Sequence, residues 1–202
     1  GQAWQDATVF EAVALGIGGN NYYKNCYVDL KEDCLRSSTT VKVFDQMRKL
    51  QSYTDEGSPG RDWNVATGMV IEGKAGFQIM GDWAKGEFTA AGKVPGVDYY
   101  CAATPSNNGY LYNVDSFIFY KSSDPDKQAG QQLLAKLMMG KNFQKVFNLY
   151  KGSIPARLDV SMDEFDKCAK TSNADIKTAG AKGGLVPSFA HGMAQGNTMK
   201  AA

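Results

Sequence analysis

Apolar residues recur at steps of three and four along much of the chain, a spacing that is typical of amphipathic helices. A polar residue that can cap a helix precedes most of these periodic segments. Asp124-Pro125 is the clearest start, because proline fits the first helical position. The pattern predicts helices that open at Asp6, Ser37, Asp62, Asp82, Asp124, Asn142 and Ser161.

Short runs of β-branched, aromatic and other apolar residues lie between these helical segments. Residues 75–80, 97–103 and 116–120 are the predicted strands. Helices that alternate with short strands indicate an α/β fold, which we expect to contain a mixed sheet flanked by helices. Residues 169–184 are polar and rich in glycine, and the pattern predicts no regular structure there.

The apolar stripes also predict which helix faces are buried. One stripe consists of Val41, Phe44, Met47 and Leu50, and it is more typical of core packing than of ligand binding. Phe143, Val146, Phe147 and Tyr150 are expected to face inward in the same way. Trp63, on another amphipathic segment, is assigned to the core.

The stretch from Glu72 to Trp83 combines a helix end at Gly73, a predicted strand and the start of a new helix. A small residue, the carboxylate of Asp82 and a tryptophan at the carboxyl end of a strand suit a ligand cleft in an α/β fold. A well-capped helix with its tryptophan in the core explains the same residues without a ligand. Asp82 is interpreted first as the helix cap, with a ligand contact as the second interpretation.

The charges of the chain nearly cancel, with 22 Lys and Arg against 21 Asp and Glu, and no arginine-rich stripe is present. Nucleic acid is therefore not expected as a partner. The longest apolar runs are far shorter than the ~20 residues of a membrane span. No phosphate-binding loop, nucleophile elbow or metal-ligand cluster is recognisable, so neither a cofactor nor a metal is expected.

The four cysteines form an even set, which suits an oxidising compartment. Cys26 with Cys34 would close a small ring, and Cys101 with Cys168 would form a long-range link. This pairing is one of three connectivities, and the sequence does not choose among them. Zinc binding is a weaker alternative, because the cysteines lack paired short spacing and the single His191 lies elsewhere. Free buried thiols remain a further alternative.

Five blocks of the sequence resemble one protein family. They are residues 1–8, 72–83, 112–117, 150–156 and 187–191, and they appear in the family's order. The chain is similar over nearly its whole length to the extracellular solute-binding proteins of bacterial ABC transporters, in the branch of the periplasmic glucose- and mannose-binding proteins. The run Thr104–Gly109 departs from the pattern, because it lacks the Pro-Gly-Thr of the family's loop.

The resemblance implies a single α/β lobe over residues 1–202, with the type II periplasmic-binding-protein fold. It also implies a periplasmic location and non-catalytic binding of a monosaccharide, with glucose favoured, for delivery to a membrane permease. Members of the family close two lobes on their sugar. The chain is therefore expected to be a carboxyl-terminal lobe with partial crossover segments and without the amino-terminal lobe.

Sugar recognition needs fixed hydrogen-bonding groups for the hydroxyls and an aromatic ring beneath the apolar face of the pyranose. Asn113 and Asp115 alternate before a predicted strand, so their side chains are expected on the same side. By resemblance the sugar-binding residues are Asn113, Asp115, Lys151, His191, Trp83 and Trp4.

Each of the polar candidates has an ordinary structural alternative. Asn113 and Asp115 would also suit an Asx turn that enters a strand. Lys151 follows the end of a predicted helix, where a lysine commonly interacts with the helix dipole. A lone histidine such as His191 is more often a surface or core residue than a ligand contact.

Two other classes of function compete with sugar binding. A glycosidase needs two carboxylates that flank the scissile bond, and only the acidity of Asp82 and Asp115 supports that pair. A lobe without a ligand would instead act as a self-associating structural module. Its homodimer would form through apolar surface around Trp4 and Ile154 that a missing lobe leaves uncovered.

Overall fold

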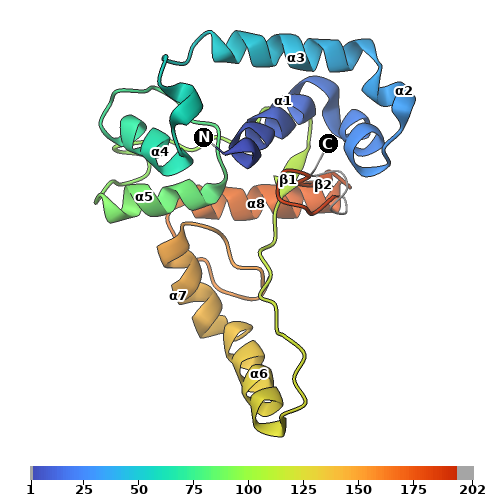
Figure 1. The fold of residues 1–202 in the computed structure, drawn as a ribbon. Coiled ribbons are helices and arrows are strands. Elements are labelled where there is room, and N and C mark those ends of the chain that lie inside the picture. Colours follow the sequence, from blue (N-terminus) through green and yellow to red (C-terminus); the bar gives the residue numbers. More distant parts are fainter. Residues whose placement is uncertain (1, 195–202) are drawn as a thin grey trace.

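The computed structural model describes residues 2–194 and is mostly helical (Figure 1). The helices are α1 (Ala3–Tyr23), α2 (Glu32–Leu35), α3 (Ser38–Gln51), α4 (Trp63–Ile71), α5 (Lys85–Ala90), α6 (Pro125–Met138), α7 (Lys141–Lys151) and α8 (Lys167–Ala181). A π-helical turn at Lys24–Val28 continues α1, and 3₁₀ turns lie at Ser58–Gly60 and Asp82–Ala84. The strands are β1 (Tyr110–Tyr112) and β2 (Leu185–Pro187). None of the described helices has the length and apolar character needed to cross a membrane.

The chain forms a body from which an arm projects (Figure 1). The body contains α1 to α5, α8 and the two strands. The arm, residues 113–151, begins with a non-helical segment that runs away from the body after β1, and α6 and α7 then return toward it. The end of α7 packs on α5, which joins the base of the arm to the body.

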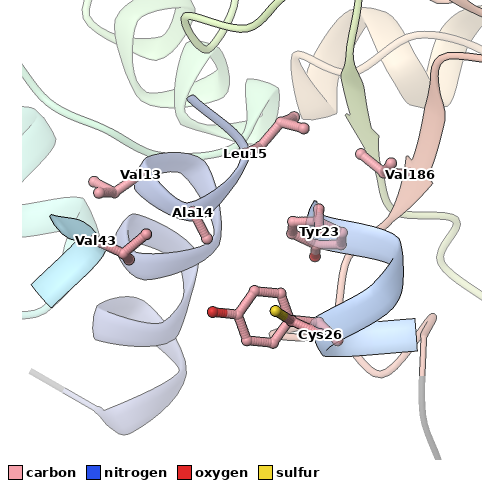
Figure 2. Close-up of a cluster of buried hydrophobic side chains, with 8 residues drawn as sticks. Val13, Ala14, Leu15, Tyr23, Cys26, Val43 and Val186 are labelled. Atoms are coloured by element: carbon pink, nitrogen blue, oxygen red, sulfur yellow. The ribbon is translucent and has the colours of Figure 1, made fainter. Parts of the chain in front are cut away.

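The main core lies between α1, α3, the π-helical turn and β2, and part of it is drawn in Figure 2. Its buried residues are Val13, Ala14, Leu15, Tyr23, Cys26, Tyr27, Val43 and Val186. The predicted stripe on α3 is partly wrong, because Val41 and Phe44 are 58% and 52% exposed. Val43 is fully buried instead, with Met47 and Leu50 packed beside it. These positions recur at helical spacing, so the buried face of α3 is rotated from the predicted one.

The predicted helix starts at Ser37 and Asp124 are confirmed. The Ser37 hydroxyl accepts a hydrogen bond from the Thr40 amide, and the Asp124 carboxylate accepts from the amides of Asp126 and Lys127. Such bonds satisfy amides that have no partner within the helix. Asp62 precedes α4 as predicted, but its carboxylate accepts from Gln5 instead of capping. Helices α1, α7 and α8 begin at Ala3, Lys141 and Lys167 rather than at the predicted Asp6, Asn142 and Ser161.

The predicted absence of structure in residues 169–184 is wrong, because most of this segment belongs to α8. The carboxylate of Asp166 accepts from the Ala169 amide and so caps the helix. Ala169 and Ala179 are buried against the rest of the body. Small residues at helical spacing therefore supply the packed face of this polar segment.

The two strands pair in parallel, with Tyr110 opposite Leu185 and Tyr112 opposite Pro187. The predicted α/β class is confirmed, because the chain combines its helices with this parallel pair of strands. The predicted strands at 75–80, 97–103 and 116–120 are wrong as members of a sheet, since within residues 2–194 they form no ladder beyond one bridge between residues 95 and 99. Phe77 and Ile118 in these segments are 96% and 75% exposed. β-Branched and aromatic residues favour extended backbone, but a ladder also requires a neighbouring strand.

The arm carries apolar side chains that the chain itself leaves uncovered. Leu133 and Leu137 of α6 are 60% and 59% exposed, and Tyr150 of α7 is 80% exposed. The prediction that Val146, Phe147 and Tyr150 face inward is therefore wrong. Their faces would be buried only against another layer, because α6 and α7 project from the body (Figure 1).

The cysteines form two disulfides, Cys26–Cys34 and Cys101–Cys168. The structure thus selects one of the three connectivities that spacing alone left open. The first closes a short ring beside the main core. The second joins the segment before β1 to the first turn of α8, and the arm lies between its two ends along the chain.

Candidate functional site

The structure brings the predicted sugar-binding residues to one region, where the arm meets the body. An open hollow of about 350 Å³ lies there, lined by Asn113 to Ser116 and by His191 to Met193. Its size falls in the range of small-ligand pockets. One wall is the segment that leaves β1, and the other is the segment that follows β2. The parallel pairing of β1 and β2 therefore places Asn113 and His191 side by side.

Asn113, Asp115 and Lys151 form a polar cluster on the arm side of the hollow. The Asn113 amide donates to one carboxylate oxygen of Asp115 over 3.0 Å, and the Lys151 ammonium donates to the other. The hydrogen bond from Lys151, together with the other nearby polar groups, lowers the pKa of Asp115 below its ordinary value. The Asp115 side chain is 57% exposed, so its carboxylate stays accessible to a ligand beside the ammonium.

Lys151 ends α7 and is held there by the glycine that follows it. Gly152 adopts a left-handed backbone conformation, with φ at 88°. A Cβ atom at this position would lie 2.6 Å from the Gly86 nitrogen and 2.9 Å from the Lys85 Cβ. The glycine therefore permits a close approach between the end of α7 and the start of α5, which places Lys151 at the base of the arm.

Trp4, Trp83 and His191 form an aromatic group beside the hollow. The ring centroids of Trp83 and His191 are 5.0 Å apart, and those of Trp4 and His191 are 5.8 Å apart. The two indoles are 6.4 Å apart and tilted by 50°. Both tryptophans are half-buried, so each keeps part of its surface exposed to a ligand.

Asp82 is not the helix cap that the sequence predicts. Gly81 takes the cap position, without a side-chain hydrogen bond. The Asp82 carboxylate instead accepts a hydrogen bond of 2.9 Å from the Ser153 hydroxyl. Burial raises the pKa of Asp82, against the opposing effects of that hydrogen bond and of the charges on Lys151 and Lys85. Asp82 thus supports the base of the arm.

The sequence-based prediction did not include two residues that lie behind His191. They are Glu11 of α1 and Ser188, which follows β2. The Ser188 hydroxyl lies 2.7 and 2.9 Å from the two oxygens of Glu11 and 2.8 Å from Nδ1 of His191. Glu11 is 3% exposed and Ser188 is 2% exposed. A signal was present in the sequence, because Glu11 is the single charged residue in the apolar run 9–15.

The arrangement can recognise a polyhydroxylated ligand by its chemistry. A carboxylate, an amide, an ammonium and an imidazole lie next to two indole rings, and such a set can match both the hydroxyls and the apolar face of a sugar ring. Within residues 2–194, no three His, Cys, Asp or Glu side chains are grouped closely enough to hold a metal ion.

The chain is similar to known proteins over most of its length. Residues 3–178 match the family model for the bacterial extracellular solute-binding protein. A protein from Brucella suis named "Probable sugar-binding periplasmic protein" is 48% identical over 201 residues, which cover 99% of this chain and 47% of that protein. A relative from Rhizobium meliloti with the same name is 46% identical, with 99% of this chain and 48% of the relative covered.

A more distant relative is the "Xylose/arabinose-binding protein" of Haloferax volcanii. It is 24% identical over 95% of this chain and 40% of its own length. The chain thus spans about half the length of the curated relatives it matches.

Proposed function

Because the chain belongs to the bacterial extracellular solute-binding protein family, we propose that it is one lobe of a monosaccharide-binding protein that supplies an ABC transporter permease. The observation that carries this proposal is the convergence of Asn113, Asp115 and His191 on one hollow beside Trp83. The family binds solutes and is not catalytic. The compartment is the periplasm, as the names of its relatives state.

The proposed ligand contacts follow from the side-chain chemistry. Asp115 accepts hydrogen bonds from two neighbouring hydroxyls, while Asn113 and Lys151 donate to others. Trp83 and Trp4 contact the apolar face of the ring. We favour glucose, with mannose, galactose and xylose as competitors. The Haloferax relative, whose name refers to xylose and arabinose, gives the pentoses particular weight as alternatives.

Binding by this chain alone is expected to be weak, because the hollow is open. A closed cleft buries most of its ligand, whereas a single wall leaves one face of the sugar in water. In the proposed whole protein a second lobe closes over that face by a hinge motion. The same lobe would cover the apolar residues of the arm.

Isothermal titration calorimetry with D-glucose, D-mannose, D-galactose and D-xylose tests the proposal. We expect Asp115→Asn to weaken binding about tenfold or more, since a hydrogen bond to a charged group contributes about 1.5–3 kcal/mol. Asp45→Asn is the matched control, because Asp45 pairs with Arg48 on the surface of α3, away from the hollow. Equal affinity in the wild type and in Asp115→Asn would contradict the proposed site.

The exposed apolar arm favours one alternative, a lobe that binds no sugar and self-associates. The surface predicted for this, around Trp4 and Ile154, is half-buried at both residues, so it stays a prediction. More strongly exposed apolar residues, Phe117, Leu133 and Leu137, lie on the arm. Size-exclusion chromatography over a range of concentrations distinguishes the two functions. A dimer that dissociates on Leu133→Lys, combined with no heat of sugar binding, would support the alternative.

A further inference from the structure

The single histidine of the chain is held by a buried relay of hydrogen bonds. Ser188 lies between Glu11 and His191, and each of its contacts is within hydrogen-bonding distance. The backbone amide of His191 also donates to the Ser188 hydroxyl oxygen, over 3.1 Å. We propose that Glu11 and Ser188 are positioning residues that fix the tautomer of His191, with the proton on Nδ1 and an acceptor lone pair on Nε2.

The acceptor at the start of this relay is Glu11. Its carboxylate is approached by three donors, the Tyr23 hydroxyl at 3.1 Å, the Ala190 amide at 3.2 Å and the Ser188 hydroxyl. With Glu11 ionised, its carboxylate accepts all three and donates none. The hydroxyl proton of Ser188 must therefore point to Glu11, since a contact of 2.7 Å between two lone pairs would be repulsive.

The hydrogen-bonding groups that remain on the Ser188 hydroxyl determine the tautomer of the His191 imidazole. A serine hydroxyl has one proton and two acceptor lone pairs. The proton is used by Glu11, and one lone pair is used by the His191 amide. The second lone pair faces Nδ1 at 2.8 Å, so Nδ1 must carry the proton. A neutral imidazole has only one N–H, and Nε2 is then a hydrogen-bond acceptor.

The other ring nitrogen, Nε2, is the acceptor that remains for a ligand. Nε2 of His191 has no hydrogen-bond partner among the described residues and is covered by protein atoms. The rings of Trp83 and Trp4 meet the imidazole edge-on, at 5.0 and 5.8 Å between centroids. A ligand that reaches Nε2 must displace a neighbouring side chain and must bring a donor. This role rests on the proposed function and selects a ligand with a hydroxyl donor at that position.

The tautomer is measured directly by NMR. In a ¹⁵N-labelled chain the long-range ¹H–¹⁵N correlations of one imidazole are observed without overlap, because the sequence contains one histidine. At pH 8, above the ordinary histidine pKa of about 6.5, we expect the pattern of the Nδ1-protonated form. Protonation at Nε2 in the wild-type chain would overturn the proposal.

Variants test whether the relay is the cause. Ser188→Ala removes the acceptor for Nδ1–H, so we expect a mixture of tautomers, whereas Ser188→Thr keeps a hydroxyl and should restore the wild-type pattern. Ser172→Ala is the matched control, because its hydroxyl contacts Tyr110 over 2.6 Å and has no contact with His191. An unchanged Nδ1-protonated pattern in Ser188→Ala would also overturn the proposal. The wild-type spectrum decides the tautomer even where a variant fails to fold.

Sugar titrations of the same samples separate this inference from the proposed function. With glucose, Ser188→Ala should weaken binding about fivefold, roughly the effect of one neutral hydrogen bond. An Nδ1-protonated histidine in a chain that binds no sugar would support the relay and contradict the proposed function. Sugar binding by a chain whose histidine is protonated at Nε2 would support the proposed function and contradict the relay.

Discussion

The Ser153 hydroxyl donates a hydrogen bond to the Asp82 carboxylate over 2.9 Å, between two residues that are 71 positions apart in the chain. This bond connects the turn that follows α7 to the turn that precedes α5. The two turns form the base of the arm, and Lys151 of the hollow lies directly beside them. The position of the polar cluster thus depends on a contact that is not itself part of the ligand site.

Asp82 should make the stability of the chain depend on pH. Its pKa is raised by burial, so the folded chain binds this proton more tightly than the unfolded chain, in which the pKa is 3.8. Its contribution to the free energy of unfolding is therefore largest below that value and decreases as the pH rises through the raised pKa. In urea titrations we expect Asp82→Asn to gain stability relative to the wild type between pH 4 and neutral pH. If the difference in unfolding free energy between Asp82→Asn and the wild type does not change with pH, the raised pKa of Asp82 is contradicted.

Gly152 should be far less tolerant of alanine than Gly73. Both residues have φ near 80°, at 88° and 73°, so both variants bear the left-handed backbone cost of about 1 kcal/mol. Only at Gly152 would the new Cβ also collide with backbone, at 2.6 Å from the Gly86 nitrogen, whereas at Gly73 it meets nothing within 4 Å. We expect Gly152→Ala to cost about 1–3 kcal/mol more than Gly73→Ala in chemical unfolding. Equal losses of unfolding free energy in the two variants would show that the packing at the base of the arm is loose.

The sequence predicts the local features of this fold better than the distant ones. The caps at Ser37 and Asp124 were recognisable because a cap involves neighbours within one helical turn. The segment around Phe77 and the segment around Ile118 have the composition of strands, yet pairing depends on a partner that composition does not specify. The buried face of α3 was misjudged because the position of α1 decides it.

The candidate site was predictable only through the family's motifs. Spacing alone allowed Asn113 and Asp115 to form an Asx turn, and it gave no reason to connect them with His191, far along the chain. The parallel register of β1 and β2 creates that proximity. Glu11 could have been suspected as a charge within an apolar run, but its contact with Ser188 depends on the packing of α1 against the end of β2.

The two disulfides should differ in their effect on stability. Cys101–Cys168 spans 67 residues and Cys26–Cys34 spans 8. Loop-closure entropy predicts stabilisation of about 4 kcal/mol by the first and about 2.5 kcal/mol by the second. The stabilisation by each disulfide is measured in a variant that keeps only that disulfide. It is the difference in unfolding free energy between the oxidised and the reduced form of that variant. A larger effect from the short ring would contradict the entropic explanation.

Trp83 should report ligand binding, whereas Trp63 should not. Trp83 lies beside His191 at the hollow, while Trp63 begins α4. On addition of glucose we expect the intrinsic fluorescence of the wild type and of Trp63→Phe to change. The change should be much smaller in Trp83→Phe, with affinity lowered about threefold to tenfold, the range for loss of one aromatic contact. An undiminished signal in Trp83→Phe would exclude this ring as the stacking platform.

The long-range disulfide has a practical consequence for handling the protein. Its two cysteines lie on opposite sides of the arm along the chain, at positions 101 and 168. A protease that nicks the exposed segment at 113–123 therefore leaves two pieces that stay covalently joined. Such a preparation migrates as one band in a non-reducing gel and separates only after a reductant is added, so a single band without reductant does not establish an uncut backbone.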